Sequence, residues 1–88
     1  PEDTVANQGL GDVYFQEGQF EKALRHLEHA LAQDEKLSVS YLIAGKCFEA
    51  LGKKVEAIKV YEAGIAIASK QGDMMPANEM QSRLNHLK

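Results

Sequence analysis

Apolar residues recur along this chain at intervals of three and four, the spacing that places them on one face of an α-helix. Leu10, Val13 and Tyr14 begin the series, and no stretch shows the sustained alternation of a half-buried strand. The pattern therefore predicts five helices, at residues 3–17, 20–33, 37–51, 54–70 and 74–87.

The predicted helices repeat with a fixed period of 34 residues. Sliding residues 4–37 onto residues 38–71 aligns seven identical pairs, which are Val5/Val39, Gly11/Gly45, Gly18/Gly52, Ala23/Ala57, Glu28/Glu62, Ala32/Ala66 and Lys36/Lys70. A constant offset of this size is typical of a protein in which one supersecondary unit is copied along the chain. The unit here is a hairpin of two helices.

Gly18 and Gly52 fall just past the ends of predicted helices, where a left-handed residue starts a tight turn. Gly72 is expected to do the same before the last helix, with Asp73 as its N-cap. Gly11 and Gly45 fall inside helices, where glycine costs up to about 1 kcal/mol relative to alanine. Small residues there indicate close contact between paired helices.

These positions resemble the tetratricopeptide repeat. The first copy carries Leu10-Gly11-x-x-Tyr14, Gly18, Phe20, Ala23-x-x-x-Leu27 and Ala30, and the second Tyr41-x-x-Ala44-Gly45-x-x-Phe48, Gly52, Ala57-x-x-x-Tyr61 and Gly64. The resemblance implies an all-α fold, a right-handed superhelical stack of antiparallel helix hairpins, which makes a tetratricopeptide-like α-solenoid of five helices. The length of 88 residues leaves room for one domain only, which we place over residues 1–88.

Within that domain we expect repeat one at residues 4–37, repeat two at 38–71 and a capping helix at 74–87. The last helix has apolar residues on one stripe and polar residues elsewhere. Its apolar stripe is Ala77, Met80, Leu84 and Leu87. A helix with a polar outer face is what a solenoid needs to close its end.

Candidate catalytic and metal-binding groups are sparse. Cys47 is the only cysteine, and its place beside Phe48 favours a small buried group over a nucleophile. His26 and His29 lie one helical turn apart without a third ligand at matching spacing, which favours a solvated helix face over a metal site. We therefore expect a non-enzymatic protein with no catalytic residues, no cofactor and no metal.

The resemblance implies a concave groove lined by the first helix of each repeat. The implied groove residues are Val5, Gln8, Gly9, Asp12, Phe15 and Gln16 in the first repeat, and Val39, Leu42, Ile43, Lys46, Glu49 and Ala50 in the second. Phe15, Val39, Leu42 and Ile43 form an expected apolar strip that suits an amphipathic helix or an extended peptide. On this expectation Leu42→Asp leaves the fold intact and abolishes association. The alternative is that some of these side chains pack between neighbouring helices.

Three functions are compatible with this fold. The leading hypothesis is a scaffold that binds a partner protein or peptide through the groove. Two repeats fall short of the three or so that usually make a stable stack, so self-association as a homodimer or larger homo-oligomer is a second hypothesis. The third is an accessory or regulatory fragment of a larger multidomain protein.

Charge and composition narrow the choice of partner. The net charge is −3 without a long run of Lys or Arg, which disfavours nucleic acid and anionic membrane surfaces. Gln8, Asp12 and Ile43 stand where relatives that grip the acidic tails of chaperones have one Lys and two Asn, which disfavours that ligand. No apolar stretch suggests membrane insertion, and the lone cysteine favours a soluble cytoplasmic protein, unless the chain belongs to a longer exported one.

Overall fold

The computed structural model describes residues 4–88, and the side chains of residues 7–88. Its helices are α1 (Thr4–Gln16), α2 (Phe20–Gln33), α3 (Ser38–Ala50), α4 (Lys54–Gln71) and α5 (Met74–Leu87). Each end lies within one residue of the end that the apolar spacing predicts. The described part of the chain contains no strand, so the predicted all-α class is confirmed.

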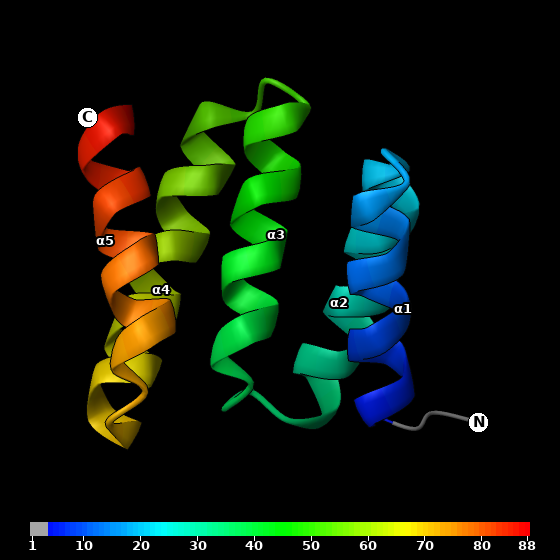
Figure 1. Ribbon diagram of the computed structural model, residues 1–88, viewed down its shortest axis with the longest axis horizontal. Helices are drawn as coiled ribbons and strands as arrows, with labels where there is room; N and C mark the ends of the chain where they lie inside the picture. Colours follow the sequence, from blue (N-terminus) through cyan, green and yellow to red (C-terminus); the bar gives the residue numbers. More distant parts are fainter. Residues whose placement is uncertain (1–3) are drawn as a thin grey trace.

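The five helices form two layers (Figure 1). Each helix packs antiparallel against the next one in the chain, and α3 also contacts α1 and α5. One layer therefore consists of α1, α3 and α5, and the other of α2 and α4. This is the stack of helix hairpins that the repeat implies, with α3 in the centre.

The two hairpins turn in the same way. Gly18 and Gly52 take left-handed φ angles of 78° and 75°, as their positions predict. The next residue's amide then donates back to a carbonyl five residues earlier, Gln19 to Tyr14 at 2.9 Å and Lys53 to Phe48 at 2.8 Å. Both turns are the Schellman type of helix end, which satisfies the last free carbonyl groups of a helix.

Glycines also set how closely the paired helices approach. A methyl group added at Gly11 would lie 2.6 Å from Leu27, and one added at Gly45 would overlap the ring of Tyr61. Leu27 and Tyr61 are themselves 34 residues apart, so the same close contact occurs in both hairpins. The prediction that these two glycines are close-contact positions is confirmed.

The core consists of two clusters that meet at α3. The first lies between α2 and α3 and comprises Ala23, Leu24, Leu27, Ile43, Ala44 and Cys47. The second lies among α3, α4 and α5 and comprises Leu42, Ala57, Tyr61, Ala68, Ala77, Met80 and Leu84. Phe48 and Val60 pack against both clusters. α5 therefore buries Ala77, Met80 and Leu84 of its predicted apolar stripe and half-buries Leu87, while its polar residues Asn78, Gln81, Ser82 and Asn85 stay exposed.

Asp73 does not cap α5 with its side chain, contrary to the sequence-based expectation. Its carboxylate instead accepts a 2.9 Å hydrogen bond from the hydroxyl of Ser38, and Gln71 donates to the Ser38 hydroxyl at 3.0 Å. These contacts join the turn before α3 to the turn before α5. A cap signal is local in sequence, whereas this partner is 35 residues away.

Ser40 provides a test of the packing around α3. Its side chain is fully buried, and the hydroxyl has no hydrogen-bond partner among the described residues. The residue one repeat earlier is Ala6. An unpaired buried hydroxyl costs about 1–3 kcal/mol, so we expect Ser40→Ala to raise the free energy of unfolding by about 1 kcal/mol in urea denaturation.

The control for this experiment is Ser82→Ala, at an exposed helical position of α5. Both substitutions gain the same helix propensity, so their difference reports the buried hydroxyl alone. A loss of stability in Ser40→Ala would show that the hydroxyl is paired after all, for example with a buried water.

Candidate functional site

An open hollow of about 470 Å³ lies on the surface where α1, the α1–α2 turn, α3 and α5 meet. We call it the Phe15 hollow; it is lined by Phe15, Gln16, Gly18, Phe20, Lys46, Glu49, Ala50 and Arg83. Five of these residues are among the predicted groove residues, namely Phe15, Gln16, Lys46, Glu49 and Ala50. The structure thus brings together residues of the first helix of each repeat and adds Arg83 from α5.

The apolar part of the hollow is aromatic. Phe15 is half-buried, and its ring meets that of Phe20 at an angle of 57° with centres 5.8 Å apart. The ammonium group of Lys46 lies 5.8 Å from the centre of the Phe15 ring, within the range of a cation–π contact. An apolar surface is therefore held next to a positive charge.

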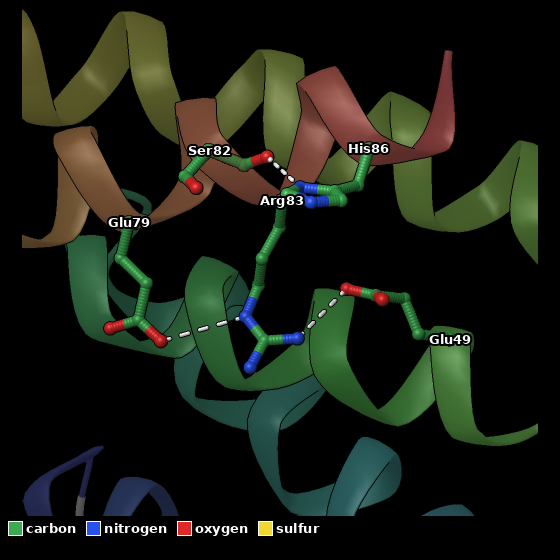
Figure 2. A pocket seen from close by; sticks show the side chains of 5 residues that line it. All are labelled: Glu49, Glu79, Ser82, Arg83 and His86. Atoms are coloured by element: carbon green, nitrogen blue, oxygen red, sulfur yellow. Dashed lines mark hydrogen bonds and ion pairs between the residues drawn. The ribbon is translucent and has the colours of Figure 1, made fainter.

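Ion pairs connect α5 to α3 at the rim of the hollow. Lys46 pairs with Glu79 at 3.2 Å, and Arg83 pairs with Glu49 at 3.3 Å and with Glu79 at 3.5 Å. Figure 2 shows the guanidinium group of Arg83 reaching between the two carboxylates. Glu49, Glu79 and Arg83 also line a second hollow of about 480 Å³, together with Ser82 and His86.

The carboxylate of Glu49 is also held by the core, because it accepts a hydrogen bond from the buried hydroxyl of Tyr61 on α4. Burial raises the pKa of Tyr61, and the bond to Glu49 raises that pKa further, so the phenol stays protonated and remains a donor. The hydrogen bond from Lys46 lowers the pKa of Glu79, with a smaller contribution from Arg83. The rim charges are thus positioned by the core and by one another.

Two members of the expected apolar strip are not on the surface. Leu42 is only 8% exposed and Ile43 only 6%, so the expectation that they are open to a partner is wrong. α3 has neighbours on both sides: Leu42 packs into the cluster with α4 and α5, and Ile43 into the cluster with α2. Val39 is 42% exposed and Phe15 half-buried, so the strip is interrupted.

The other predicted groove residues lie along α1. Gly9, Asp12 and Gln16 are exposed and Gln8 is half-buried. The side chain of Gln16 donates to Asp12 at 3.4 Å. The side chain of Val5 lies outside the described residues, although its backbone belongs to α1.

The sequence analysis missed Glu79, Arg83 and His86, because it treated the last helix only as a cap. The order of the helices in the sequence could have predicted that these three residues lie beside α3. α5 follows α4 as α3 follows α2, so α5 completes the α1–α3 layer and its polar residues face the same side. Its ion pairs with α3 follow from that position.

The cysteine and histidine side chains that could take part in catalysis are buried or in contact with neighbouring side chains. Burial raises the pKa of Cys47 to about 11, and its side chain is fully buried, which confirms the packing role. His26 lies 3.0 Å from the amide oxygen of Asn7 and stacks on Tyr14. Across the described residues no three His, Cys, Asp or Glu side chains are grouped to hold a metal ion.

The helices described here were also compared with the length and hydropathy of a membrane span, and none of them meets both.

Comparison with known proteins agrees with this architecture. Residues 2–70 match the sequence model of the tetratricopeptide repeat. A TPR repeat-containing protein of Pseudomonas aeruginosa is 35% identical over 79 residues, which span 90% of this chain and 75% of that protein.

Two solution structures are similar throughout. A tetratricopeptide repeat domain protein from Salinibacter ruber has a TM-score of 0.88 at 25% identity, covering all of this chain and 89% of that one. A protein from Bordetella parapertussis has a TM-score of 0.88 at 33% identity, covering 97% of this chain and 74% of that one. Repeat period, turn geometry and these similarities lead to one assignment: the chain belongs to the tetratricopeptide repeat family.

Proposed function

We propose that this protein is a non-catalytic scaffold that binds a segment of a partner protein through the Phe15 hollow. The family's fold is generally a non-enzymatic scaffold for protein interactions. The observation that carries the proposal is the composition of the hollow, in which aromatic rings from α1 and α2 lie beside positioned charges from α3 and α5. A concave surface with an apolar centre and a few oriented polar groups is typical of binding sites.

The partner segment we expect carries an aromatic or branched aliphatic side chain. That side chain would bury apolar surface against Phe15, Phe20 and Ala50, at about 25 cal/mol per Å² removed from water. Lys46, Glu49 and Arg83 are already held by ion pairs, so they lose little side-chain freedom when a segment binds. The main-chain amides of the segment can donate hydrogen bonds to the carboxylate of Glu49, and its carbonyls can accept them from Lys46 and Arg83.

The charge balance argues against a strongly acidic ligand. Lys46 and Arg83 are the cations of the rim, and both are paired with carboxylates of Glu49 and Glu79. A ligand carboxylate would have to displace those pairs. The groove therefore suits a segment of mixed polarity around an apolar anchor, in keeping with the absence of the residues that grip chaperone tails.

Ala50→Arg tests the proposal, because residue 50 is exposed, lines the hollow and ends α3. An arginine there fills the hollow, and a cation at a helix C-terminus is favourable to the helix. We expect peptides selected on the wild-type protein from a displayed random library to bind Ala50→Arg at least about tenfold more weakly, a loss of about 1.4 kcal/mol.

The matched control is Ala63→Arg, at an exposed alanine of α4 in the other layer. It should bind the selected peptides as the wild type does, with both variants showing wild-type circular dichroism and melting temperature. Selected peptides that bind all three proteins equally would place the binding surface outside the hollow and contradict the proposal.

A further inference from the structure

The second hollow lies next to the Phe15 hollow and shares side chains with it. Its volume is about 480 Å³, and we call it the His86 hollow; it is lined by Glu49, Glu79, Ser82, Arg83 and His86 (Figure 2). Glu49 and Arg83 line both hollows, so the two meet at these side chains. A segment held in the Phe15 hollow can therefore continue past Arg83. What the second hollow would hold rests on the proposed function, because it would be a further part of the same segment.

The charged groups around the His86 hollow balance one another. Glu79 pairs with Lys46 at 3.2 Å and with Arg83 at 3.5 Å. Arg83 also pairs with Glu49 at 3.3 Å. These are two carboxylates and two cations, so the network has no net charge. A ligand side chain of either charge would meet a like charge nearby, which is unfavourable. The hollow therefore suits an uncharged side chain.

The charged groups also keep hydrogen-bonding atoms that the network does not use. The ion pairs occupy Nε and Nη1 of Arg83, whereas Nη2, which carries two N–H groups, is bound to neither carboxylate. The contacts of Glu49 and Glu79 use Oε2, including the hydrogen bond from Tyr61, which leaves Oε1 of each carboxylate as an acceptor. Arg83 and the two glutamates are between 26% and 46% exposed, so a ligand can reach these atoms.

His86 and Ser82 add further polar atoms to the hollow. Nδ1 of His86 lies 3.0 Å from the main-chain carbonyl of Ser82. A carbonyl can only accept a hydrogen bond, so Nδ1 carries the proton of the neutral ring and Nε2 is left as an acceptor. The Ser82 hydroxyl can donate or accept. The hollow thus offers both donors and acceptors to a ligand.

A carboxamide is the uncharged side chain that matches this combination. Its oxygen can accept a hydrogen bond from Nη2 of Arg83, and its NH₂ group can donate to a carboxylate oxygen or to Nε2 of His86. A ligand carboxylate has no donor for Glu49 and Glu79, and a ligand ammonium group has no acceptor for Arg83. An apolar side chain would separate these polar groups from water without replacing their hydrogen bonds, which is costly.

We propose that the His86 hollow is a second subsite of the groove, which takes the carboxamide side chain of an Asn or Gln in the partner segment. The apolar anchor of the same segment occupies the Phe15 hollow, and Arg83 lies between the two side chains. Arg83 determines specificity, because Glu49 and Glu79 hold its guanidinium group in place before the segment binds. The recognised feature is an aromatic or branched aliphatic residue with an Asn or Gln at a fixed offset from it.

Selection of displayed random peptides on the wild-type protein tests the subsite. The selected sequences should carry Asn or Gln at one fixed offset from the apolar anchor. In a selected peptide, replacing that residue by Glu or by Lys should weaken binding at least about tenfold, a loss of about 1.4 kcal/mol. Glu has nearly the shape of Gln, so a Gln-to-Glu replacement reports the added charge and the lost N–H donors with little change in size.

Arg83→Lys is the variant that tests the specificity residue, because it keeps the positive charge and removes the planar guanidinium group. Peptides selected on this variant should keep the apolar anchor and lose the enrichment of Asn and Gln. The penalty for replacing Asn or Gln by Glu should fall from about tenfold to about twofold or less.

The matched control is Arg25→Lys, at an exposed arginine of α2 in the other layer. It should bind the selected peptides as the wild type does, with wild-type circular dichroism in both variants. If Arg83→Lys loses its fold, His86→Ala replaces it in the same comparison, and His29→Ala, at an exposed histidine of α2, becomes the control.

Three results would overturn the proposal. These are selected peptides without Asn or Gln at a fixed offset, peptides that bind equally well with Gln and with Glu there, and a variant at position 83 or 86 that behaves as its control does. In each of these cases weaker binding to Ala50→Arg would still support the Phe15 hollow, so the two proposals can fail separately. A library that yields no binding peptide, or peptides that bind Ala50→Arg and Arg83→Lys as the wild type, would contradict both.

Discussion

Gly45→Ala should lower the free energy of unfolding by about 2 kcal/mol, although it replaces glycine by the best helix-forming residue. The added methyl group would overlap the ring of Tyr61. That ring is fully buried and its hydroxyl is bound to Glu49, so it cannot move aside without breaking the bond or opening α3 from α4. Urea denaturation followed by circular dichroism measures the loss, and Gly45→Leu should cost still more.

The matched control is Gly9→Ala, which makes the same substitution inside α1. Among the described residues, nothing beyond the adjoining backbone of α1 and the two chain neighbours of Gly9 lies within 4 Å of a methyl group added at Gly9. The higher helix propensity of alanine is then the main effect of the substitution, so Gly9→Ala should raise the free energy of unfolding by about 0.5–1 kcal/mol. Opposite signs for the two substitutions are the expected result, whereas an unchanged denaturation midpoint for Gly45→Ala would show that the α3–α4 contact is looser than described.

Leu42→Asp should unfold the protein or leave it with little stability. Leu42 lies in the cluster formed with α4 and α5, and replacing it loses about 2–5 kcal/mol of packing, as for other buried leucines cut back to small residues. A carboxylate in that place also needs solvation or a cation, and the cluster supplies neither. Natural domains have only about 5–15 kcal/mol of stability, so the loss is decisive. Thermal melting and the helical circular-dichroism signal at room temperature report it.

Val39→Asp makes the comparison on the same helix. Val39 is 42% exposed in the first turn of α3, where the helix dipole favours a negative charge by about 0.3–1 kcal/mol. Its stability should stay within about 0.5 kcal/mol of the wild type. A folded Leu42→Asp variant with a wild-type melting temperature would return Leu42 to the surface, as the sequence alone suggested, and would contradict the packing described here.

The contrast between Leu42 and Val39 explains where the sequence-based groove failed. Both residues lie at implied groove positions of α3, and the periodicity of one helix cannot distinguish two adjacent buried faces from one buried and one open face. α3 lies between α1 and α5 and also packs on α2 and α4, so more of its surface is buried than on a helix with a single partner. Of the implied groove residues, five line the Phe15 hollow, namely Phe15, Gln16, Lys46, Glu49 and Ala50.

Local chemistry in the sequence determined the number of helices, their bounds and the turns between them. Apolar spacing fixes which residues are helical, and left-handed φ angles at Gly18, Gly52 and Gly72 need glycine whatever surrounds them. The 34-residue offset also located the close contacts of Gly11 and Gly45, because a costly residue kept in both copies of a helix has a packing reason.

Only the tertiary structure decided which polar and apolar side chains remain available. Arg83 reaches Glu49 across 34 residues of sequence, Asp73 binds Ser38 instead of capping its own helix, and Leu10 is open where Ala44 is covered. None of these is encoded by the residues nearby in the chain. Each depends on which helix packs against which, since burial is a property of the neighbours that the fold supplies and not of the residue itself.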